Sequence, residues 1–213
     1  MQILSPDQLE EAAVMLKKGK ILVFPTETSY GLGCDATNQS AVDKIFKIKE
    51  RSADKQLMMV VPEVEMAKKY LAWNSLVDRV AIKYWPGPVT VVAEYIGNIL
   101  KAGLGKIQKV YLLANGVVSD AGTLAVRVTA HPVVKFLSEK LGRPLVATSA
   151  NIAGAGEIYD SQKLVKVFST RAVQPDALVD NGLLPHHLPT TLVRIRQGKL
   201  EILRQGEVKI EIY

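Results

Sequence analysis

Residues 144–151 read PLVATSAN, a short apolar run that ends in small hydroxyl and amide side chains. Residues 21–33, ILVFPTETSYGLG, repeat this design, because an apolar run again leads into hydroxyl groups and glycines. Each apolar run has the length and the flanking residues of a buried strand. Ligand crevices of open α/β sheets form outside the carboxyl ends of their strands. The two runs therefore predict an α/β fold whose polar strand ends form the site of an enzyme.

Helix and strand patterns are interspersed along the rest of the chain. We expect helices over residues 6–18, 41–50, 64–70, 75–84, 132–141 and 161–169, with Ser5, Ser40 and Asp160 as N-caps. We expect strands over residues 21–25, 57–61, 89–95, 110–114, 123–128, 145–148, 191–195 and 200–204, the last two forming a hairpin. Several strands follow one another directly. The pattern therefore predicts a mixed, twisted, open sheet flanked by helices, in a single domain of residues 1–213.

Composition limits the class of protein. Of the 213 residues, 48% are hydrophobic and 23% are charged, which is typical of globular domains and argues against disorder or a coiled coil. No apolar run approaches the roughly 18 residues of a membrane span, and residues 1–7 show no secretory signal. Cys34 is the only cysteine, which excludes an intrachain disulfide and a four-cysteine zinc site. We expect a cytoplasmic protein without membrane contact. The net charge of +6 favours a phosphate-rich partner, although a basic solvated surface explains it equally well.

The apolar row of the helix at residues 41–50 ends in a lysine. Val42, Ile45 and Phe46 lie at positions i, i+3 and i+4, and Lys49 follows at i+7. One interpretation is that Lys49 extends to water at the C-terminal end of the helix, where the helix dipole favours a cation. The alternative is that Lys49 and Arg51 face a cleft and bind an anionic substrate, for which the planar guanidinium of Arg51 is well suited.

Four hydroxyl groups, on Thr26, Thr28, Ser29 and Tyr30, precede the GLG of residues 31–33. A loop of this kind can bind a polar ligand, with glycines that let the ligand approach the backbone. An ordinary hydroxyl-rich turn has the same composition. Residues 31–36 also fit the dinucleotide fingerprint G-x-G-x-x-A, but they do not join a strand directly to a helix, so this match is weak.

Many ordered segments resemble the YrdC family, the threonylcarbamoyl-AMP synthases. PTETSYGLG at 25–33 resembles the family's P-T-E-T-x-Y-G-L-G, KER at 49–51 its K-x-R, PGPVT at 86–90 its P-G-P-x-T, and TSAN at 148–151 its T-S-A-N. AVR at 125–127, HP at 131–132, TTLV at 190–193 and LRQG at 203–206 continue the match in the same order. The resemblance covers nearly the whole chain. It implies a YrdC-like twisted open sheet with a large, positively charged cavity, without the extra C-terminal domain of longer members.

The resemblance also implies a reaction. Family members are nucleotidyltransferases that form threonylcarbamoyl-AMP and pyrophosphate from L-threonine, bicarbonate and ATP, for N6-threonylcarbamoyladenosine at position 37 of tRNA. A carbamate oxygen attacks the α-phosphorus of ATP, and an anion attacking an anion needs dense positive charge and accurate positioning. Mg²⁺ is expected to enter with ATP, because it keeps several waters and relies on phosphate oxygens. Weak tRNA binding and transfer of the product to the downstream threonylcarbamoyl transferase complex are further expectations.

The resemblance assigns roles to individual residues. Those that match the family's catalytic group are Lys49, Arg51, Ser149 and Asn151. Those that match ATP-binding positions are Arg51, Lys55, Thr123, Ser149 and Arg204. Those that match threonine-binding positions are Thr28, Arg127, Thr148 and Thr190, and Arg127 is expected to hold the threonine carboxylate. No metal ligand is expected from the protein itself.

Five residues depart from the family pattern beside the expected site. Ser52 and Gln56 replace prolines, and Thr129 replaces another common proline. Val60 stands where some members have a threonine-binding histidine, and Ala153 replaces a serine. These departures bear on threonine affinity more than on nucleotide binding.

Two other functions fit the same residues. The first is a related enzyme that forms a different carbamoyl-adenylate or uses another amino acid. The second is a non-enzymatic RNA-binding module that uses the same positive charge. Aromatic residues make up only 6% of the chain, and no aromatic alternation marks a base-stacking surface, which argues against the second.

Overall fold

The computed structural model describes residues 1–52, 54–97 and 112–211 of the chain. Its strands are β1 (Gln2–Leu4), β2 (Leu22–Pro25), β3 (Tyr30–Asp35), β4 (Met59–Val61), β5 (Val89–Glu94), β6 (Thr123–Val128), β7 (Leu145–Ser149), β8 (Ala177–Val179), β9 (Thr191–Arg196) and β10 (Lys199–Arg204). The helices described here are α1 (Leu9–Lys17), α2 (Gln39–Lys49), α3 (Val64–Lys68), α4 (Ser75–Tyr84), α6 (Pro132–Leu141) and α7 (Ser161–Ser169).

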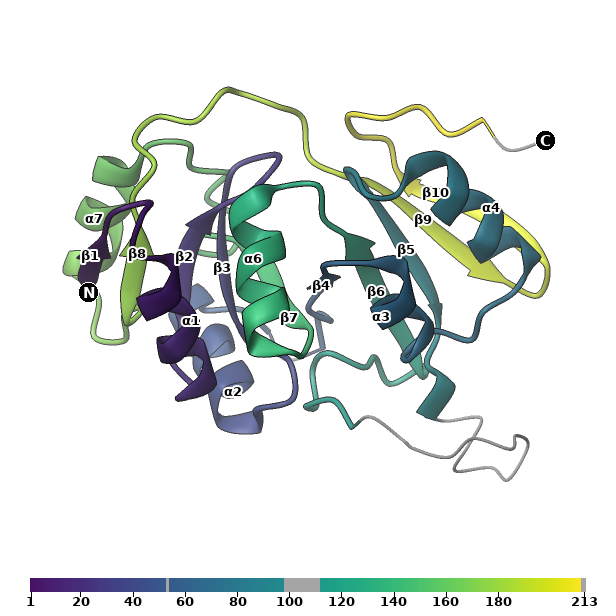
Figure 1. Cartoon of the computed structure of the whole chain (residues 1–213), viewed down its shortest axis with the longest axis horizontal. Coiled ribbons are helices and arrows are strands. Elements are labelled where there is room, and N and C mark those ends of the chain that lie inside the picture. The colour runs from purple at the N-terminus through teal and green to yellow at the C-terminus, as the bar shows by residue number, and fades with distance from the viewer. Residues whose placement is uncertain (53, 98–111, 212–213) are drawn as a thin grey trace.

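The strands form one 10-stranded sheet in the order β1-β8-β2-β3-β7-β4-β6-β5-β9-β10 (Figure 1). Parallel pairs such as β4 with β6 and β5 with β9 stand beside antiparallel pairs such as β3 with β7 and β5 with β6. The sheet is open, with β1 and β10 at its two edges. The predicted mixed, twisted sheet flanked by helices is therefore confirmed. In the described ranges, no helix is both long enough and apolar enough to cross a membrane.

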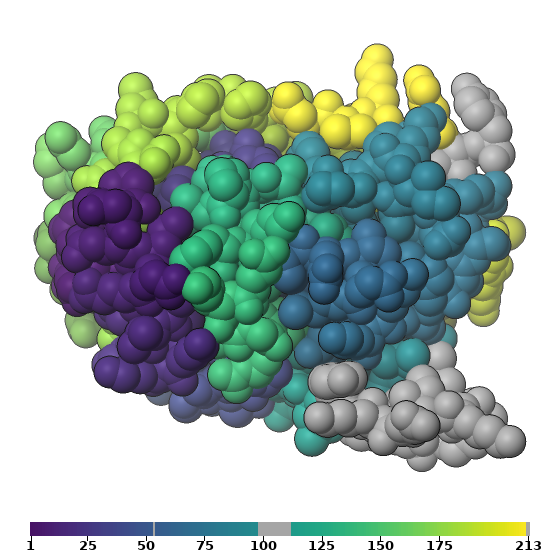
Figure 2. All heavy atoms as spheres, viewed as in Figure 1, coloured from purple at the N-terminus to yellow at the C-terminus, as the bar shows by residue number. Residues whose placement is uncertain are grey.

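Helices cover the sheet in two groups that bury opposite faces of the strands. α1 and α6 pack together over residues such as Leu22 and Phe24 of β2, whereas α2 and α7 contribute to the cluster that contains Ile21 and Val23. This division follows from the alternation of side chains along a strand. Figure 2 shows α1, α6 and the segment around α3 as one continuous layer on this side of the molecule.

The segment expected to be a glycine-rich ligand loop is strand β3. Gly31 pairs with Phe24 of β2 and Ser149 of β7, so β3 lies inside the sheet. A Cβ added to Gly33 would lie 2.1 Å from the Val146 carbonyl oxygen and 2.7 Å from the Phe24 ring. Gly33 therefore makes room for the Phe24 ring and the neighbouring strand rather than for a ligand, whereas Gly31 lines the cavity described below. The hydroxyl-rich loop is limited to residues 26–29, which join β2 to β3.

Several predicted boundaries change for local reasons. α1 begins at Leu9 because the amide and hydroxyl of Ser5 both donate to Gln8 Oε1, so Ser5 does not cap a helix backbone. Asn38 caps α2 in place of Ser40, with its Oδ1 accepting from the Ala41 amide at 3.1 Å. The predicted cap at Asp160 is confirmed.

Two strand predictions also change. Of the strand predicted over residues 110–114, residues 112–114 are not in a strand, and residues 110–111 lie outside the described residues. β1 and β8 were missed because three residues are too few for a recognisable pattern.

Candidate active site

Strands β5, β6 and β9 have side chains on both faces of the sheet. On one face they pack in the core, and on the other they line a large cavity. On β6, Val126 and Val128 are buried in the core, whereas Thr123, Ala125 and Arg127 line the cavity. The cavity extends to the loop after β2 and the end of β7, and its volume is about 840 Å³. Pockets of this size hold complete small-molecule ligands. The polar residues after β2 and at the end of β7 are therefore brought together at one cavity.

Positive charge dominates the described lining of this cavity. Its arginines are Arg51, Arg127, Arg194, Arg196 and Arg204. Its carboxylates are Glu94 and Glu157. An excess of cationic side chains in a concave site attracts anionic ligands and concentrates them there. The chemistry of the cavity therefore suits a phosphate or carboxylate compound.

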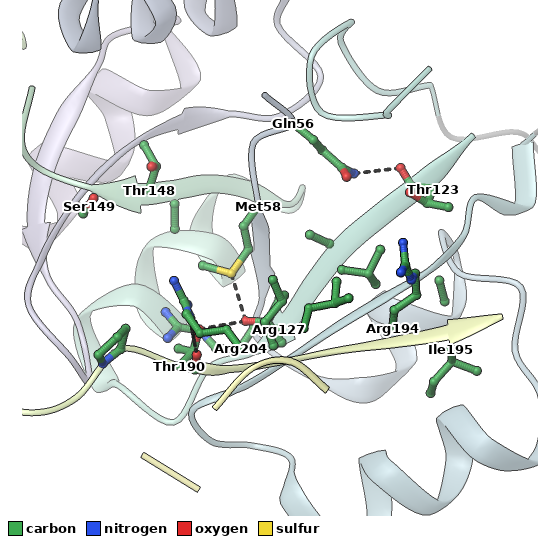
Figure 3. A pocket seen from close by; sticks show the side chains of 18 of the residues that line it. Gln56, Met58, Thr123, Arg127, Thr148, Ser149, Thr190, Arg194, Ile195 and Arg204 are labelled. Carbon is green, nitrogen blue, oxygen red and sulfur yellow. Dashed lines mark hydrogen bonds between the residues drawn. The ribbon is translucent and has the colours of Figure 1, made fainter. Parts of the chain in front are cut away.

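Most of the predicted site residues reach the cavity. Those that line it are Thr28, Arg51, Thr123, Arg127, Thr148, Ser149, Thr190 and Arg204, and most of them are labelled in Figure 3. Lys49, Lys55 and Asn151 are not in the lining. Lys55 is exposed on the loop that follows α2. Lys49 and Asn151 lie behind the wall of the cavity and support it.

Lys49 is buried at the end of α2 with an exposed fraction of 1%. Its Nζ donates to the Ser149 carbonyl oxygen at 2.5 Å, the Asn151 carbonyl oxygen at 3.0 Å and the Asn151 Oδ1 at 2.8 Å. Ser149 Oγ donates to the same Asn151 Oδ1 at 2.8 Å. For Lys49 neither interpretation holds, because its ammonium neither extends to water nor lines the cavity, whereas Arg51 does line it as the second interpretation expects. Lys49 instead holds the turn after β7 that presents Ser149.

The protonation of Lys49 is sensitive to this setting. Burial, with a smaller contribution from the nearby charge of Arg51, lowers the pKa of Lys49 to about 7. The ammonium form has three donors for the three oxygens around it, whereas the neutral amine has only two. Loss of the proton therefore removes one of the hydrogen bonds that hold the turn after β7.

Arg51 is fixed by the carbonyl groups of its own loop. Its Nε donates to the Lys55 oxygen at 3.1 Å, and its Nη2 donates to the Gln56 oxygen at 3.0 Å. The Gln56 amide in turn donates to the carbonyl oxygens of Val117 at 2.9 Å and Thr123 at 2.7 Å (Figure 3). Sequence reasoning treated Gln56 only as a departure from the family pattern. Gln56 joins the loop of Arg51 to the start of β6 across the rim of the cavity.

Arg204 and Thr190 join the predicted ATP and threonine sides of the site. Arg204 donates to the Thr190 carbonyl oxygen from Nε at 3.1 Å and from Nη2 at 2.9 Å, and Nη2 also lies 3.1 Å from the Thr190 hydroxyl. That hydroxyl lies 3.2 Å from the hydroxyl of Thr90, which is 3.0 Å from the sulfur of Met58 (Figure 3). The two sides of the predicted site are therefore in direct contact through the β9–β10 hairpin.

Arg127 has an exposed fraction of 2% and lines the cavity. Its Nη2 lies 3.2 Å from Glu27 Oε2, and its buried Nε has no hydrogen-bond partner among the described residues. Val60, the departure expected to affect threonine binding, pairs with Arg127 in the sheet and is fully buried outside the cavity lining. Sequence reasoning missed Glu27 as a partner of Arg127. Glu27 lies in the loop after β2 and Arg127 lies on β6, 100 positions further along the chain.

Arg194 and Arg196 were also missed, although the sequence contains a signal for them. They alternate with apolar residues along β9, TLVRIR, and so point to the same face of the strand. Both line the cavity. Among the described residues, no group of three or more His, Cys, Asp or Glu side chains is placed to hold a metal ion.

Comparison with known proteins gives consistent matches. A family model named Sua5_yciO_yrdC and described as "Telomere recombination" matches residues 14–206. The chain is similar to a threonylcarbamoyl-AMP synthase of Psychromonas ingrahamii, at 30% identity over 200 residues that cover 92% of this chain and 97% of that protein.

Two solved structures show the same fold. The structure of P. abyssi Sua5 complexed with L-threonine matches with a TM-score of 0.81 and 26% identity, over 96% of this chain and 57% of that one. This chain therefore spans little more than half the length of that Sua5. E. coli YciO matches with a TM-score of 0.78 and 20% identity, over 96% of this chain and 94% of that one, and this likeness concerns the fold alone.

Proposed function

This chain belongs to the Sua5/YciO/YrdC family, and on that premise we propose that it is a threonylcarbamoyl-AMP synthase. It condenses L-threonine, bicarbonate and ATP into threonylcarbamoyl-AMP and pyrophosphate. The observation that carries the proposal is the arginine-rich cavity of about 840 Å³, which contains most of the residues matched to the two substrates. The relative named for this activity is covered over 97% of its length.

The reaction brings three anionic groups together, namely the triphosphate of ATP, the carbamate and the carboxylate of threonine. The threonine amine and bicarbonate form a carbamate with loss of water. A carbamate oxygen then attacks the α-phosphorus, and the bond from the α-phosphorus to the bridging oxygen breaks, which releases pyrophosphate. Fixed cationic donors reduce the repulsion between carbamate and triphosphate without reorganising during the reaction. We assign this role to Arg51 and Arg204, which line the cavity and are already held by carbonyl groups. Lys55 is exposed on the loop that carries Arg51, and it binds the outer phosphates.

The amino acid lies on the other side of the cavity. Arg127 pairs with the threonine carboxylate, and the hydroxyls of Thr28, Thr148 and Thr190 contact its polar groups. Ser149, between the two sides, contacts the nucleotide and the carbamate. Lys49 and Asn151 act without touching substrate, because their hydrogen bonds hold the turn that carries Ser149.

Mg²⁺ fits this site as a companion of ATP. The cavity lining among the described residues contains only Glu94 and Glu157 as carboxylates, so the ion would rely chiefly on phosphate oxygens and water. Bound with ATP, it would neutralise phosphate charge. The product then passes to the transferase complex that modifies adenosine 37 of tRNA.

The test is pyrophosphate release from ATP by the purified chain. We expect release only when L-threonine and bicarbonate are both present, and we expect Arg51→Ala to abolish most of it. Pyrophosphate release at the same rate with and without threonine would contradict the proposal. Faster release with another amino acid would identify a related carbamoyl-adenylate synthase, and RNA binding without any turnover would identify a binding module. Adding tRNA and the transferase complex tests the final transfer.

A further inference from the structure

Arg127 is a buried cation whose hydrogen-bonding capacity is unfilled. A guanidinium has five N–H donors, and a buried donor without an acceptor is costly. Arg127 is 2% exposed, its Nε has no partner among the described residues, and its one ion pair is to Glu27. A side chain with so few partners needs support from its neighbours to keep one orientation toward the cavity.

Glu27 is itself fixed from the side opposite Arg127. Its Oε1 accepts from the Thr129 hydroxyl at 2.6 Å, the Ala130 amide at 2.8 Å and the His131 amide at 3.3 Å. Its Oε2 is buried and lies 3.2 Å from Arg127 Nη2, with no hydrogen-bond partner of its own. The two short hydrogen bonds to Oε1, with a longer one from the His131 amide, restrain the carboxylate and leave Oε2 directed at Arg127.

The charge of Glu27 persists at neutral pH. Burial alone raises the pKa of this carboxyl, but the charge of Arg127, the Thr129 hydroxyl and backbone N–H groups outweigh burial, so the pKa is lowered below its ordinary value. His131, the other titratable group at this cluster, is more readily neutral because burial lowers its pKa. The fixed carboxylate therefore remains the only anionic partner of Arg127 among the described residues.

Thr129 makes three contacts that a proline at this position could not make. Its amide donates to the Val61 carbonyl oxygen at 3.1 Å, and its hydroxyl donates to Glu27 and accepts from the His131 amide at 3.1 Å. Proline has neither a backbone N–H nor a hydroxyl. Thr129 and Glu27 do not line the cavity, so they act on it only through Arg127.

We propose that Thr129 and Glu27 form a brace that positions Arg127 for the carboxylate of the amino-acid substrate, an inference that rests on the proposed synthase function. Both are positioning residues, since neither touches substrate. The brace raises affinity for an amino acid because the guanidinium is ordered before the substrate arrives. It is specific to the amino-acid side of the cavity and leaves ATP binding unchanged.

The experiment measures pyrophosphate release while threonine and ATP are titrated separately, for the wild type, Glu27→Gln, Thr129→Ala and Thr129→Ser. We expect Glu27→Gln to raise the KM for threonine roughly tenfold and Thr129→Ala a few-fold, with the KM for ATP within about twofold of wild type. Thr129→Ser keeps the hydroxyl and should restore the wild-type KM. Ser138→Ala is the matched control, because Ser138 is fully buried and its hydroxyl donates to the Arg143 carbonyl oxygen away from the cavity.

A second readout separates positioning from general loosening of the fold. L-threoninol lacks the carboxylate, so the ratio of threonine to threoninol affinity, measured by calorimetry without turnover, reports the Arg127 contact. We expect this ratio to fall in Glu27→Gln and Thr129→Ala and to be unchanged in Ser138→Ala. Equal rises in both KM values, or an unchanged ratio in folded variants, overturns the brace. A wild type without threonine-dependent release overturns the synthase function instead.

Discussion

Lys49 and Arg127 are both almost fully buried beside the same cavity, yet their hydrogen bonding differs. Lys49 has three oxygen acceptors for the three donors of its ammonium, all supplied by the turn after β7. Arg127 has one neighbouring carboxylate and a buried Nε without a partner in the described chain, and it lines the cavity. Burial alone therefore does not distinguish the two. A cation satisfied by the protein supports the site, and one left unsatisfied at a cavity wall is available to a ligand.

The largest expected effect comes from removing the unsatisfied cation. Arg127→Met removes the proposed carboxylate contact and leaves Glu27 buried without its counter-charge. We expect the KM for threonine to rise about 100-fold, or ~3 kcal/mol, because charge-assisted hydrogen bonds are the strong ones. Threonine titrations of pyrophosphate release measure this change. The KM for ATP should change much less.

The control for this variant is an arginine with a carboxylate partner but no cavity. Arg143 lies 3.0 Å from Asp35 and is not in the cavity lining. Arg143→Met should leave both KM values near those of wild type. If Arg143→Met weakens threonine binding as much as Arg127→Met does, Arg127 has no specific role in binding threonine, because any lost arginine would then have the same effect.

The next effect concerns Lys49 and the pH dependence of stability. The pKa of Lys49 is about 7 in the folded protein and 10.5 as its ordinary value. Between these values the unfolded chain binds more protons than the folded one, so the contribution of Lys49 to stability increases with pH. The free energy of unfolding of wild type minus that of Lys49→Met should therefore rise by about 2 kcal/mol from pH 7 to pH 9. Urea unfolding of both proteins at several pH values measures it.

A flat difference between the two proteins across that pH range would show that the three oxygens keep Lys49 charged in the folded state. Activity then sharpens the comparison in another way. Lys49→Met should lower kcat by displacing Ser149, with a smaller change in the KM for threonine. A rise confined to the KM for ATP would mean that Lys49 binds phosphate directly.

The polar ends of two buried strands could be predicted from the sequence, and most of the predicted site residues do line the cavity. Apolar runs identify strands, and the family resemblance assigns Arg51, Arg127 and Ser149 to one site. The burial of Lys49 could not be predicted, because the helical pattern shows which face a residue occupies but not which oxygens from β7 meet it. The glycines of β3 predict a loop because glycine usually marks turns, whereas here Gly33 makes room for Phe24.

The partner of Arg127 was equally hidden. Glu27 and Arg127 meet only because the loop after β2 lies beside the end of β6, and no local pattern records that contact. Arg194 and Arg196 differ, since alternation along β9 placed them on one face. Residues that act through tertiary contact are therefore the ones that the sequence conceals. Gln56 is another such residue, after Lys49 and Glu27, because the sequence shows it only as the replacement of a proline.

The smallest expected effect tests Gln56, whose amide connects the loop of Arg51 to β6. Gln56→Met keeps the length of the side chain but loses the hydrogen bonds to Val117 and Thr123. We expect the KM for ATP to rise roughly fivefold, or about 1 kcal/mol, because a typical hydrogen bond contributes about that much. Gln174→Met is the matched control, since the Gln174 amide also donates to two carbonyl oxygens, those of Ser169 and Arg171, on an exposed surface. A larger rise in the KM for threonine than in the KM for ATP would show that Gln56 supports threonine binding, as Arg127 does. The cavity would then not be divided into an ATP side and a threonine side.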